Sequence, residues 1–201
     1  IIKKNSKNII IITEKRNNLL FNLSKKLNLQ LIEHNPFLGG RYSVMSEVGL
    51  IPAYLMGLNI SKLRSKTTVY LKGKKKLFLK KSTTIITKLL MYSNIKNLIF
   101  LNYSPELEKF LFWCQQLIAE SLGKRGNGFL PIISNVPKDH HSLLQLYLDG
   151  QRDKIFYILS LKEEDKKPTK NIFTGKYSFL KTKSFNQIKN AQKEALIKTL
   201  R

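Results

Sequence analysis

Cysteine and histidine are scarce in this chain, and both shortages exclude kinds of site. Cys114 is the one cysteine in 201 residues, so no framework of internal disulfides exists and nothing requires an oxidising compartment. With three histidines, at positions 34, 140 and 141, a structural zinc site is not expected. Cys114 falls inside an apolar helical stripe, which favours core packing over nucleophilic catalysis. We therefore expect a cytoplasmic protein without a metal centre.

Long apolar runs are also missing. No run approaches the roughly 18 to 20 apolar residues that a membrane-spanning helix needs. Ile1 and Ile2 are followed at once by Lys3 and Lys4, whereas a signal peptide has a longer apolar region before its cleavage site. The sequence therefore predicts neither secretion nor a membrane partner.

Acidic residues are few. The chain has 13 Asp and Glu against 36 Lys and Arg, which gives a formal net charge of +23. Such a charge is typical of proteins that bind nucleic acids, and nucleic-acid binding is the first alternative. The lysines are spread from Lys3 to Lys198, however, and apolar residues 77–79 interrupt the one dense run, at 72–81. We therefore expect no nucleic-acid partner.

Short apolar runs rich in β-branched residues alternate with longer helical patterns. This alternation predicts an α/β fold, a three-layer sandwich in which helices flank a parallel sheet. The expected strands are 9–13, 30–33, 97–102, 129–134 and 154–161. The expected helices are 17–27, 46–58 with Pro52 inside it, one or two within 60–90 with a break at Gly73, 104–120, 141–147 and 185–200. Residues 162–170 are expected to form a charged surface loop.

The beginning of the chain looks like the end of a domain. Residues 1–60 lack the strands that a complete sheet of this kind needs, so we expect a first domain that is incomplete here. Residues 61–201 are expected to form a second domain that ends in a helix. Gly123, Gly126 and Gly128 do not make a dinucleotide-binding fingerprint, because they follow a helix rather than a strand.

Three clusters of residues carry possible chemistry, and the first is Gly39-Gly40-Arg41. Glycines let the backbone approach a ligand closely or adopt a positive φ, and Arg41 supplies a charge for a developing oxyanion. The alternative is a plain loop turn with a solvated arginine.

The second cluster lies at the end of the helix expected over 104–120. Glu120 is expected to be half-buried there, and burial raises the pKa of a carboxyl toward the range that a general base needs. Gln116 lies one turn earlier on the same face and can orient the base or a substrate. The alternative is a helix-terminal glutamate exposed to water.

The third cluster is Asp139-His140-His141 at an expected helix start. A neutral imidazole is favoured at a helix N-terminus, so His141 can exchange protons with a ligand oxygen. His140 is interpreted as a bystander, and a capping or surface role remains the alternative for His141.

Taken together, these clusters resemble the signature motifs of one enzyme family. Gly39-Gly40-Arg41-Tyr42-Ser43 is similar to the GGRxS motif of glucose-6-phosphate isomerases. Residues 113–124, W-C-Q-Q-L-I-A-E-S-L-G-K, resemble their W-x-Q-Q-L-x-x-E-S-x-G-K motif, and residues 139–145, D-H-H-S-L-L-Q, resemble their D-Q-H-S-x-x-Q motif. The three motifs occur in the family's order, and the resemblance covers roughly residues 30–160.

The resemblance implies sugar-isomerase (SIS) domains and a cofactor-free aldose–ketose isomerisation. Glucose 6-phosphate and fructose 6-phosphate would interconvert through an enediol, in glycolysis and gluconeogenesis. The resemblance assigns Glu120 the proton transfer, His141 the ring opening from across a homodimer interface, Arg41 the stabilisation of the enediolate, and Gln116 and Gly40 substrate contacts. The positive charge of the chain also favours sugar phosphates. The alternative is a sugar-phosphate-binding regulator without turnover.

The sequence departs from the family's pattern at three places. His140 stands where the family has glutamine. The family's Ser/Thr-rich phosphate-binding loop is not visible, because Ser82-Thr83-Thr84 comes too late in the order. Phe185-Asn186-Gln187 matches only the opening of a C-terminal motif, in which Glu194 replaces a lysine. No catalytic role is assigned to this last segment.

Overall fold

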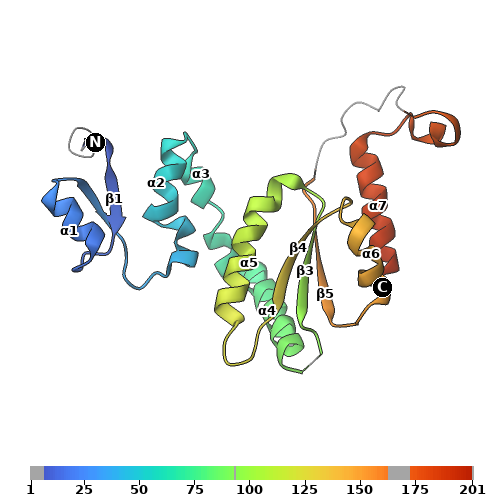
Figure 1. Cartoon of the computed structure of the whole chain (residues 1–201), viewed down its shortest axis with the longest axis horizontal. Helices are drawn as coiled ribbons and strands as arrows, with labels where there is room; N and C mark the ends of the chain where they lie inside the picture. The colour runs from blue at the N-terminus through green and yellow to red at the C-terminus, as the bar shows by residue number, and fades with distance from the viewer. Residues whose placement is uncertain (1–6, 93, 163–172, 201) are drawn as a thin grey trace. The chain divides into compact units, whose positions relative to one another are not determined.

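The structure is a computed structural model, and it describes residues 7–92, 94–162 and 173–200. The chain divides into two units, Ile1–Thr83 and Thr84–Arg201, and each is described by itself. Figure 1 shows the elements along the chain, coloured from blue at the N-terminus to red at the C-terminus.

The first unit contains a two-stranded parallel sheet. Strand β1 (Ile10–Thr13) pairs with β2 (Gln30–Glu33), with Ile10 opposite Gln30. Helix α1 (Leu19–Lys26) connects them, and the Asn18 side chain caps it by accepting a hydrogen bond from the Phe21 amide at 2.9 Å. The two strands are parallel because the chain returns through a helix, as a βαβ unit requires. The carboxyl ends of both strands therefore lie at the same edge of the sheet.

Four shorter elements follow β2 and lead to a long helix. They are the 3₁₀ helix η2 (Gly40–Met45), α2 (Glu47–Leu55), α3 (Ile60–Arg64) and the 3₁₀ helix η3 (Thr68–Leu71), after which α4 (Gly73–Tyr92) crosses the division between the units. Helix α2 ends at Leu55 rather than at the predicted position 58. Pro52 lies in its last turn, where the missing N–H of proline weakens the helix.

The second unit is built on a three-stranded parallel sheet. Strand β3 (Asn97–Asn102) lies in the middle, between β4 (Leu130–Asn135) and β5 (Lys154–Leu159). All three strands run in the same direction. Five of the six residues of β3 are buried, as expected for a strand covered on both faces.

Alternate residues of β3 enter two separate cores, which makes the unit a three-layer sandwich. Ile99 and Leu101 pack on one side, in a core that includes Tyr147 of helix α6 (His140–Asp149) and Leu196 of helix α7 (Phe185–Thr199). The opposite core contains Leu98 and Phe100 of β3, Leu111 of helix α5 (Glu108–Leu122), and Ile86, Leu89 and Leu90 of α4. Figure 1 shows α5 and α6 on opposite sides of the sheet.

Local signals in the sequence account for most helix ends in this unit. Ser104-Pro105 begins a short 3₁₀ helix, η4 (Pro105–Leu107), before α5, so the predicted helix start was too early. Gly150 ends α6. Another 3₁₀ helix, η5 (Gly175–Leu180), precedes α7, which starts at a capping box formed by Ser184 and Gln187.

The α/β class with parallel sheets flanked by helices is confirmed. The assignment of 1–60 and 61–201 to two domains stays a prediction, although the division between the units falls inside α4. The surface loop expected at 162–170 lies, apart from Lys162, outside the described residues. Within the described part of the chain, no helix is both long enough and apolar enough to span a bilayer.

Candidate active site

Gln116 and Glu120 form a direct pair on α5. The Gln116 amide nitrogen Nε2 donates a hydrogen bond to Glu120 Oε1 at 2.9 Å, across the i, i+4 spacing of a helix. The pair therefore fixes the orientation of the carboxylate at the last turn of α5. This contact brings together two of the predicted site residues.

The environment of Glu120 differs from the prediction of a half-buried carboxyl. Both Glu120 and Gln116 are exposed. Helix α5 uses its opposite face for packing, with Leu111, Cys114 and Ile118 directed at the sheet. Glu120 lies too far around the helix from this stripe to enter the core, so only a further surface laid over α5 can desolvate it. The sequence pattern located the helix end but not this exposure.

His140 and His141, next to each other in the first turn of α6, have different environments. His141 is exposed and available to an outside ligand. His140 is half-buried, and its Nε2 lies 3.3 Å from the hydroxyl of Tyr103, with the two rings edge to face at 6.1 Å. Burial lowers the pKa of His140 and raises the pKa of Tyr103 to about 12. His140 is therefore not a bystander to the fold, because its ring nitrogen pairs with the hydroxyl of the buried Tyr103.

A chain of polar side chains lies at the carboxyl ends of β3 and β4. Asn102 Nδ2 donates to Asn135 Oδ1 at 3.0 Å, and Asn135 Nδ2 donates to Glu108 Oε1 at 2.8 Å. Asp139 Oδ2 accepts the backbone N–H of Asn135 at 2.7 Å. Sequence reasoning missed this network. The signal that identifies it is an asparagine at the end of each of two neighbouring apolar strands.

Arg41 belongs to the first unit, within η2. Its guanidinium lies 4.7 Å from the centre of the Tyr42 ring. The buried Ser43 donates from Oγ to the Gly40 carbonyl at 2.7 Å, and Ser46 donates to the Ser43 carbonyl at 2.8 Å. These two bonds hold the turn that carries Arg41.

The glycines of this motif do not adopt the positive φ considered from the sequence. Gly39 has φ −61° and ψ 147°, and Gly40 lies outside the positive-φ residues as well. A Cβ on Gly40 would meet no atom within 4 Å. No positive φ and no close contact within the described structure requires glycine at position 40, and its contact with a substrate stays a prediction. Arg41 and Gly40 lie in one unit, and the other predicted site residues, Gln116, Glu120 and His141, lie in the second.

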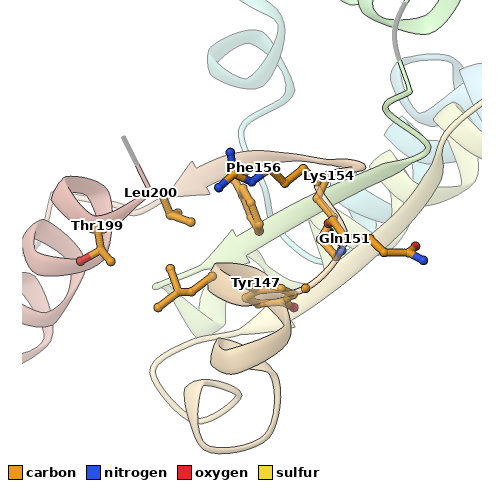
Figure 2. Close-up of a pocket in the computed structure, with 9 residues that line it drawn as sticks. Tyr147, Gln151, Lys154, Phe156, Thr199 and Leu200 are labelled. Atoms are coloured by element: carbon orange, nitrogen blue, oxygen red, sulfur yellow. Dashed lines mark hydrogen bonds between the residues drawn. The ribbon is translucent and has the colours of Figure 1, made fainter.

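A cavity of about 310 Å³ in the second unit lies away from these residues. Tyr147, Gly150, Lys154, Phe156 and Leu200 contribute to its lining, and Figure 2 shows the side chains around it. It is found at the C-terminal end of α6, whereas His141 is in the first turn of that helix. The Lys154 ammonium already binds the Gln151 carbonyl and the Asp153 carboxylate, each at 2.7 Å. We assign no function to this cavity.

Cys114 is half-buried against the α4/α5 core, and burial raises the pKa of its thiol. A raised pKa disfavours the thiolate, so packing is the role that the structure supports, as expected from the sequence. No group of three metal-binding side chains occurs in the described ranges.

A parallel sheet between two helical layers, with polar side chains at the carboxyl ends of its strands, places the second unit in the class of three-layer α/β proteins. No family model matches the chain. It is, however, 37% identical over 128 residues to the glucose-6-phosphate isomerase of Methanocaldococcus jannaschii, an alignment that covers 62% of this chain and 32% of the relative. It is 33% identical over 171 residues to the enzyme of that name from Acholeplasma laidlawii, covering 82% of this chain and 40% of the relative.

The similarity extends over nearly the whole chain in two further comparisons. The glucose-6-phosphate isomerase of Mycoplasmopsis pulmonis is 28% identical over 208 residues, covering 97% of this chain and 47% of the relative. The crystal structure of a hypothetical protein from Thermus thermophilus superposes with a TM-score of 0.78 and 25% identity, covering 98% of this chain and 50% of that one. The chain is thus homologous to part of the glucose-6-phosphate isomerases, which confirms the family resemblance. It spans 32% to 47% of the length of these curated relatives.

Proposed function

We propose that the chain forms part of an enzyme that interconverts glucose 6-phosphate and fructose 6-phosphate without a cofactor. The observation that carries this proposal is the Gln116–Glu120 pair on the exposed face of α5, in a chain homologous to glucose-6-phosphate isomerases. A carboxylate held by an amide and open to a ligand is what a general base needs. The proposal includes a cytoplasmic location and a place in glycolysis and gluconeogenesis.

In the proposed reaction Glu120 removes the proton from C2 of the open-chain aldose. The C–H electron pair forms the C1–C2 double bond, and the carbonyl oxygen at C1 takes the negative charge. Arg41 stabilises this enediolate. The C2 hydroxyl then gives its proton to the oxygen on C1, and the electron pair on the C2 oxygen forms the C2 carbonyl while the double-bond pair takes the proton back from Glu120 at C1, which gives the ketose. The amide of Gln116 keeps the carboxylate directed at the two carbons. A fixed cation is effective here because the charge develops only as the proton leaves.

His141 is proposed to open the sugar ring by giving a proton to the ring oxygen and taking one from the C1 hydroxyl. Its exposure supports this role, because an exposed side chain in the first turn of α6 is accessible to a substrate. We further propose that the working unit is a homodimer in which His141 serves the site of the partner subunit. Gly40 and Gln116 are proposed substrate contacts, and the net charge of +23 favours an anionic sugar.

Substitution of Glu120 tests the proposal. Glu120→Gln keeps the shape of the side chain and its hydrogen bond to Gln116 but removes the base, so kcat should fall by about 10² to 10⁴ while KM changes little. Glu106→Gln, which neutralises another exposed carboxylate of the same unit, is the matched control and should leave both constants unchanged. The measurement is steady-state conversion of fructose 6-phosphate by a protein that includes this chain.

The alternative functions predict different results in the same experiments. A sugar-phosphate-binding regulator without turnover binds both sugars without converting either, whether or not Glu120 is substituted. A nucleic-acid-binding protein shows affinity for RNA or DNA that falls steeply with salt concentration. Near-normal turnover by Glu120→Gln would remove Glu120 from the mechanism.

A further inference from the structure

His34 and Glu47 join the two ends of the loop that carries Arg41. His34 follows β2 directly, and Glu47 is the first residue of α2, with η2 and its Arg41 between them. The Nδ1 nitrogen of His34 contacts the Oε1 oxygen of Glu47. The contact joins the two ends of this loop, which lie thirteen positions apart in the sequence.

The second ring nitrogen of His34 binds the start of the same loop. Nε2 lies 2.9 Å from the Leu38 carbonyl oxygen, which is an acceptor only, so this nitrogen carries a proton. Nδ1 faces a carboxylate, which is also an acceptor when ionised. Both ring nitrogens are therefore satisfied when His34 is an imidazolium ion.

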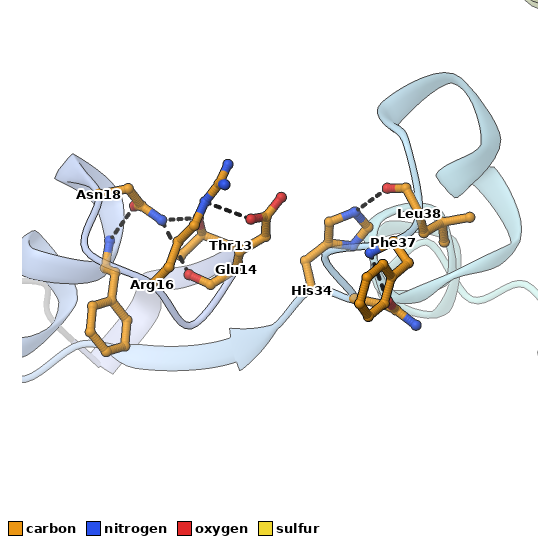
Figure 3. A network of polar contacts seen from close by, with 9 residues as sticks. Thr13, Glu14, Arg16, Asn18, His34, Phe37 and Leu38 are labelled. Atoms are coloured by element: carbon orange, nitrogen blue, oxygen red, sulfur yellow. Dashed lines mark hydrogen bonds and ion pairs between the residues drawn. The ribbon is translucent and has the colours of Figure 1, made fainter.

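The charges around His34 favour that ion. The hydrogen bond with Glu47 is the main cause of the raised pKa of His34, and the Leu38 carbonyl adds to it. The same bond lowers the pKa of Glu47. From the end of β1, Glu14 also faces His34 and is itself paired with Arg16 at 2.6 Å. Figure 3 shows Glu14, Arg16 and His34, which follow the carboxyl ends of β1 and β2. Together with Thr13 and Asn18 they line a cavity of about 400 Å³.

We propose that the His34–Glu47 ion pair is a positioning device that fixes the Arg41 loop for the isomerisation. The inference rests on the proposed function, because it assumes that Arg41 stabilises the enediolate. Neither residue belongs to the Gly-Gly-Arg motif itself. The pair holds the ends of the loop, and the two serine bonds inside η2 hold its turn. A cation that stabilises a developing charge must already be in position before the reaction starts. If the ends of the loop are no longer held together, Arg41 is less well positioned, and kcat falls more than KM rises.

Four variants separate this role from a general effect on the fold. His34→Phe removes both ring contacts. His34→Asn keeps a donor near the position of Nδ1, within reach of Glu47, but loses the bond to Leu38. Glu47→Gln removes the negative partner, and Glu33→Gln, the matched control, neutralises an exposed carboxylate at the end of the same strand.

The first readout is amide hydrogen exchange of residues 40–46 in the 201-residue chain, which needs no enzymatic activity. Exchange should become about tenfold faster in His34→Phe and Glu47→Gln and should not change in Glu33→Gln. In a histidine NMR titration, the pKa of His34 should fall in Glu47→Gln. Unchanged amide exchange of residues 40–46 in both His34→Phe and Glu47→Gln would overturn the proposal.

The second readout is activity. In a protein that isomerises, kcat should fall about tenfold in His34→Phe with KM little changed, and His34→Asn should retain more activity than His34→Phe. The kcat of the unsubstituted protein should decline as pH rises through the raised pKa of His34, and this decline should be absent in His34→Asn. If no protein isomerises, the unsubstituted one included, the proposed function fails, whereas the exchange rates still decide whether the pair holds the loop.

Discussion

At the scale of single residues, His140 packs within the fold, whereas its neighbour His141 is the residue proposed to open the sugar ring. Tyr103 is fully buried, and its hydroxyl meets His140 Nε2. The two histidines are consecutive on a helix, so a ring anchored inward at 140 leaves the ring at 141 directed elsewhere. Anchoring of His140 thus contributes to the exposure of His141.

His140→Leu should destabilise the chain by about 1 to 3 kcal/mol, because it leaves the buried Tyr103 hydroxyl without this acceptor. His140→Gln, which restores an acceptor of similar length, should lose less. The measurement is the free energy of unfolding in urea. His141→Leu is the control, since His141 is exposed and its replacement should change stability by no more than about 0.5 kcal/mol. Equal losses at 140 and 141 would contradict the assigned contact.

The pH dependence of stability follows from the direction of the His140 shift. Burial lowers its pKa in the folded chain below the ordinary value of 6.5. The unfolded chain therefore takes up a proton first as pH falls, and stability is lost below about 6.5 down to the lowered pKa. For His34, with its raised pKa, stability is instead lost as pH rises through that pKa. Comparison of the unsubstituted chain with His140→Gln at pH 7 and pH 5 isolates the first effect.

At the scale of elements, the close approach of α2 to η2 holds the Arg41 loop from a second side. A Cβ on Gly49 would lie 2.1 Å from the Val44 carbonyl oxygen and 2.7 Å from the carbonyl carbon. Real Cβ atoms do not approach backbone so closely, so α2 and η2 keep this arrangement only with glycine at 49.

Gly49→Ala should therefore force α2 and η2 apart at a cost of about 1 to 3 kcal/mol, the usual range for added bulk at a tightly packed site. Gly40→Ala, whose added Cβ would meet no atom, is the matched control and should leave the stability nearly unchanged. Thermal unfolding and circular dichroism of the two variants measure this difference. A stable Gly49→Ala chain with unchanged exchange in 40–46 would show that the approach is not needed.

The sequence predicted most elements because their periodicity is local. Strands 97–102 and 30–33 have the predicted bounds, and the first of them contains a four-residue apolar run, 98–101, that suits a buried strand. The exposure of Glu120 could not be predicted in the same way. It depends on which face of α5 meets the sheet and on what covers the other face, and both are properties of packing. The contact between His34 and Glu47 joins residues thirteen positions apart, and no helical or strand period connects them.

At the scale of the whole molecule, the chain spans less than half of the length of its curated relatives, and the residues of the proposed site lie in two units. The phosphate is the group of the proposed substrate that can contribute most to its binding. Binding energy from such a remote group normally positions the reacting carbons. The described residues provide the proposed base, the ring-opening histidine and the stabilising arginine, whereas the loop that grips the phosphate in the resembling family was not identified in the sequence.

The 201 residues expressed alone should therefore fold at least in part but isomerise fructose 6-phosphate poorly. Addition of the N-terminal half of a related glucose-6-phosphate isomerase, fused or in trans, should raise the rate by a factor of about 10² or more, because positioning of the reacting atoms accounts for rate factors of this size. The same addition to a Glu120→Gln chain is the control and should give no comparable increase.

Efficient turnover by the chain alone would contradict this prediction, and the lysines at 72–76 would then be the candidate phosphate site. Their replacement by glutamine should then raise KM for the phosphorylated sugar, which steady-state kinetics would measure directly.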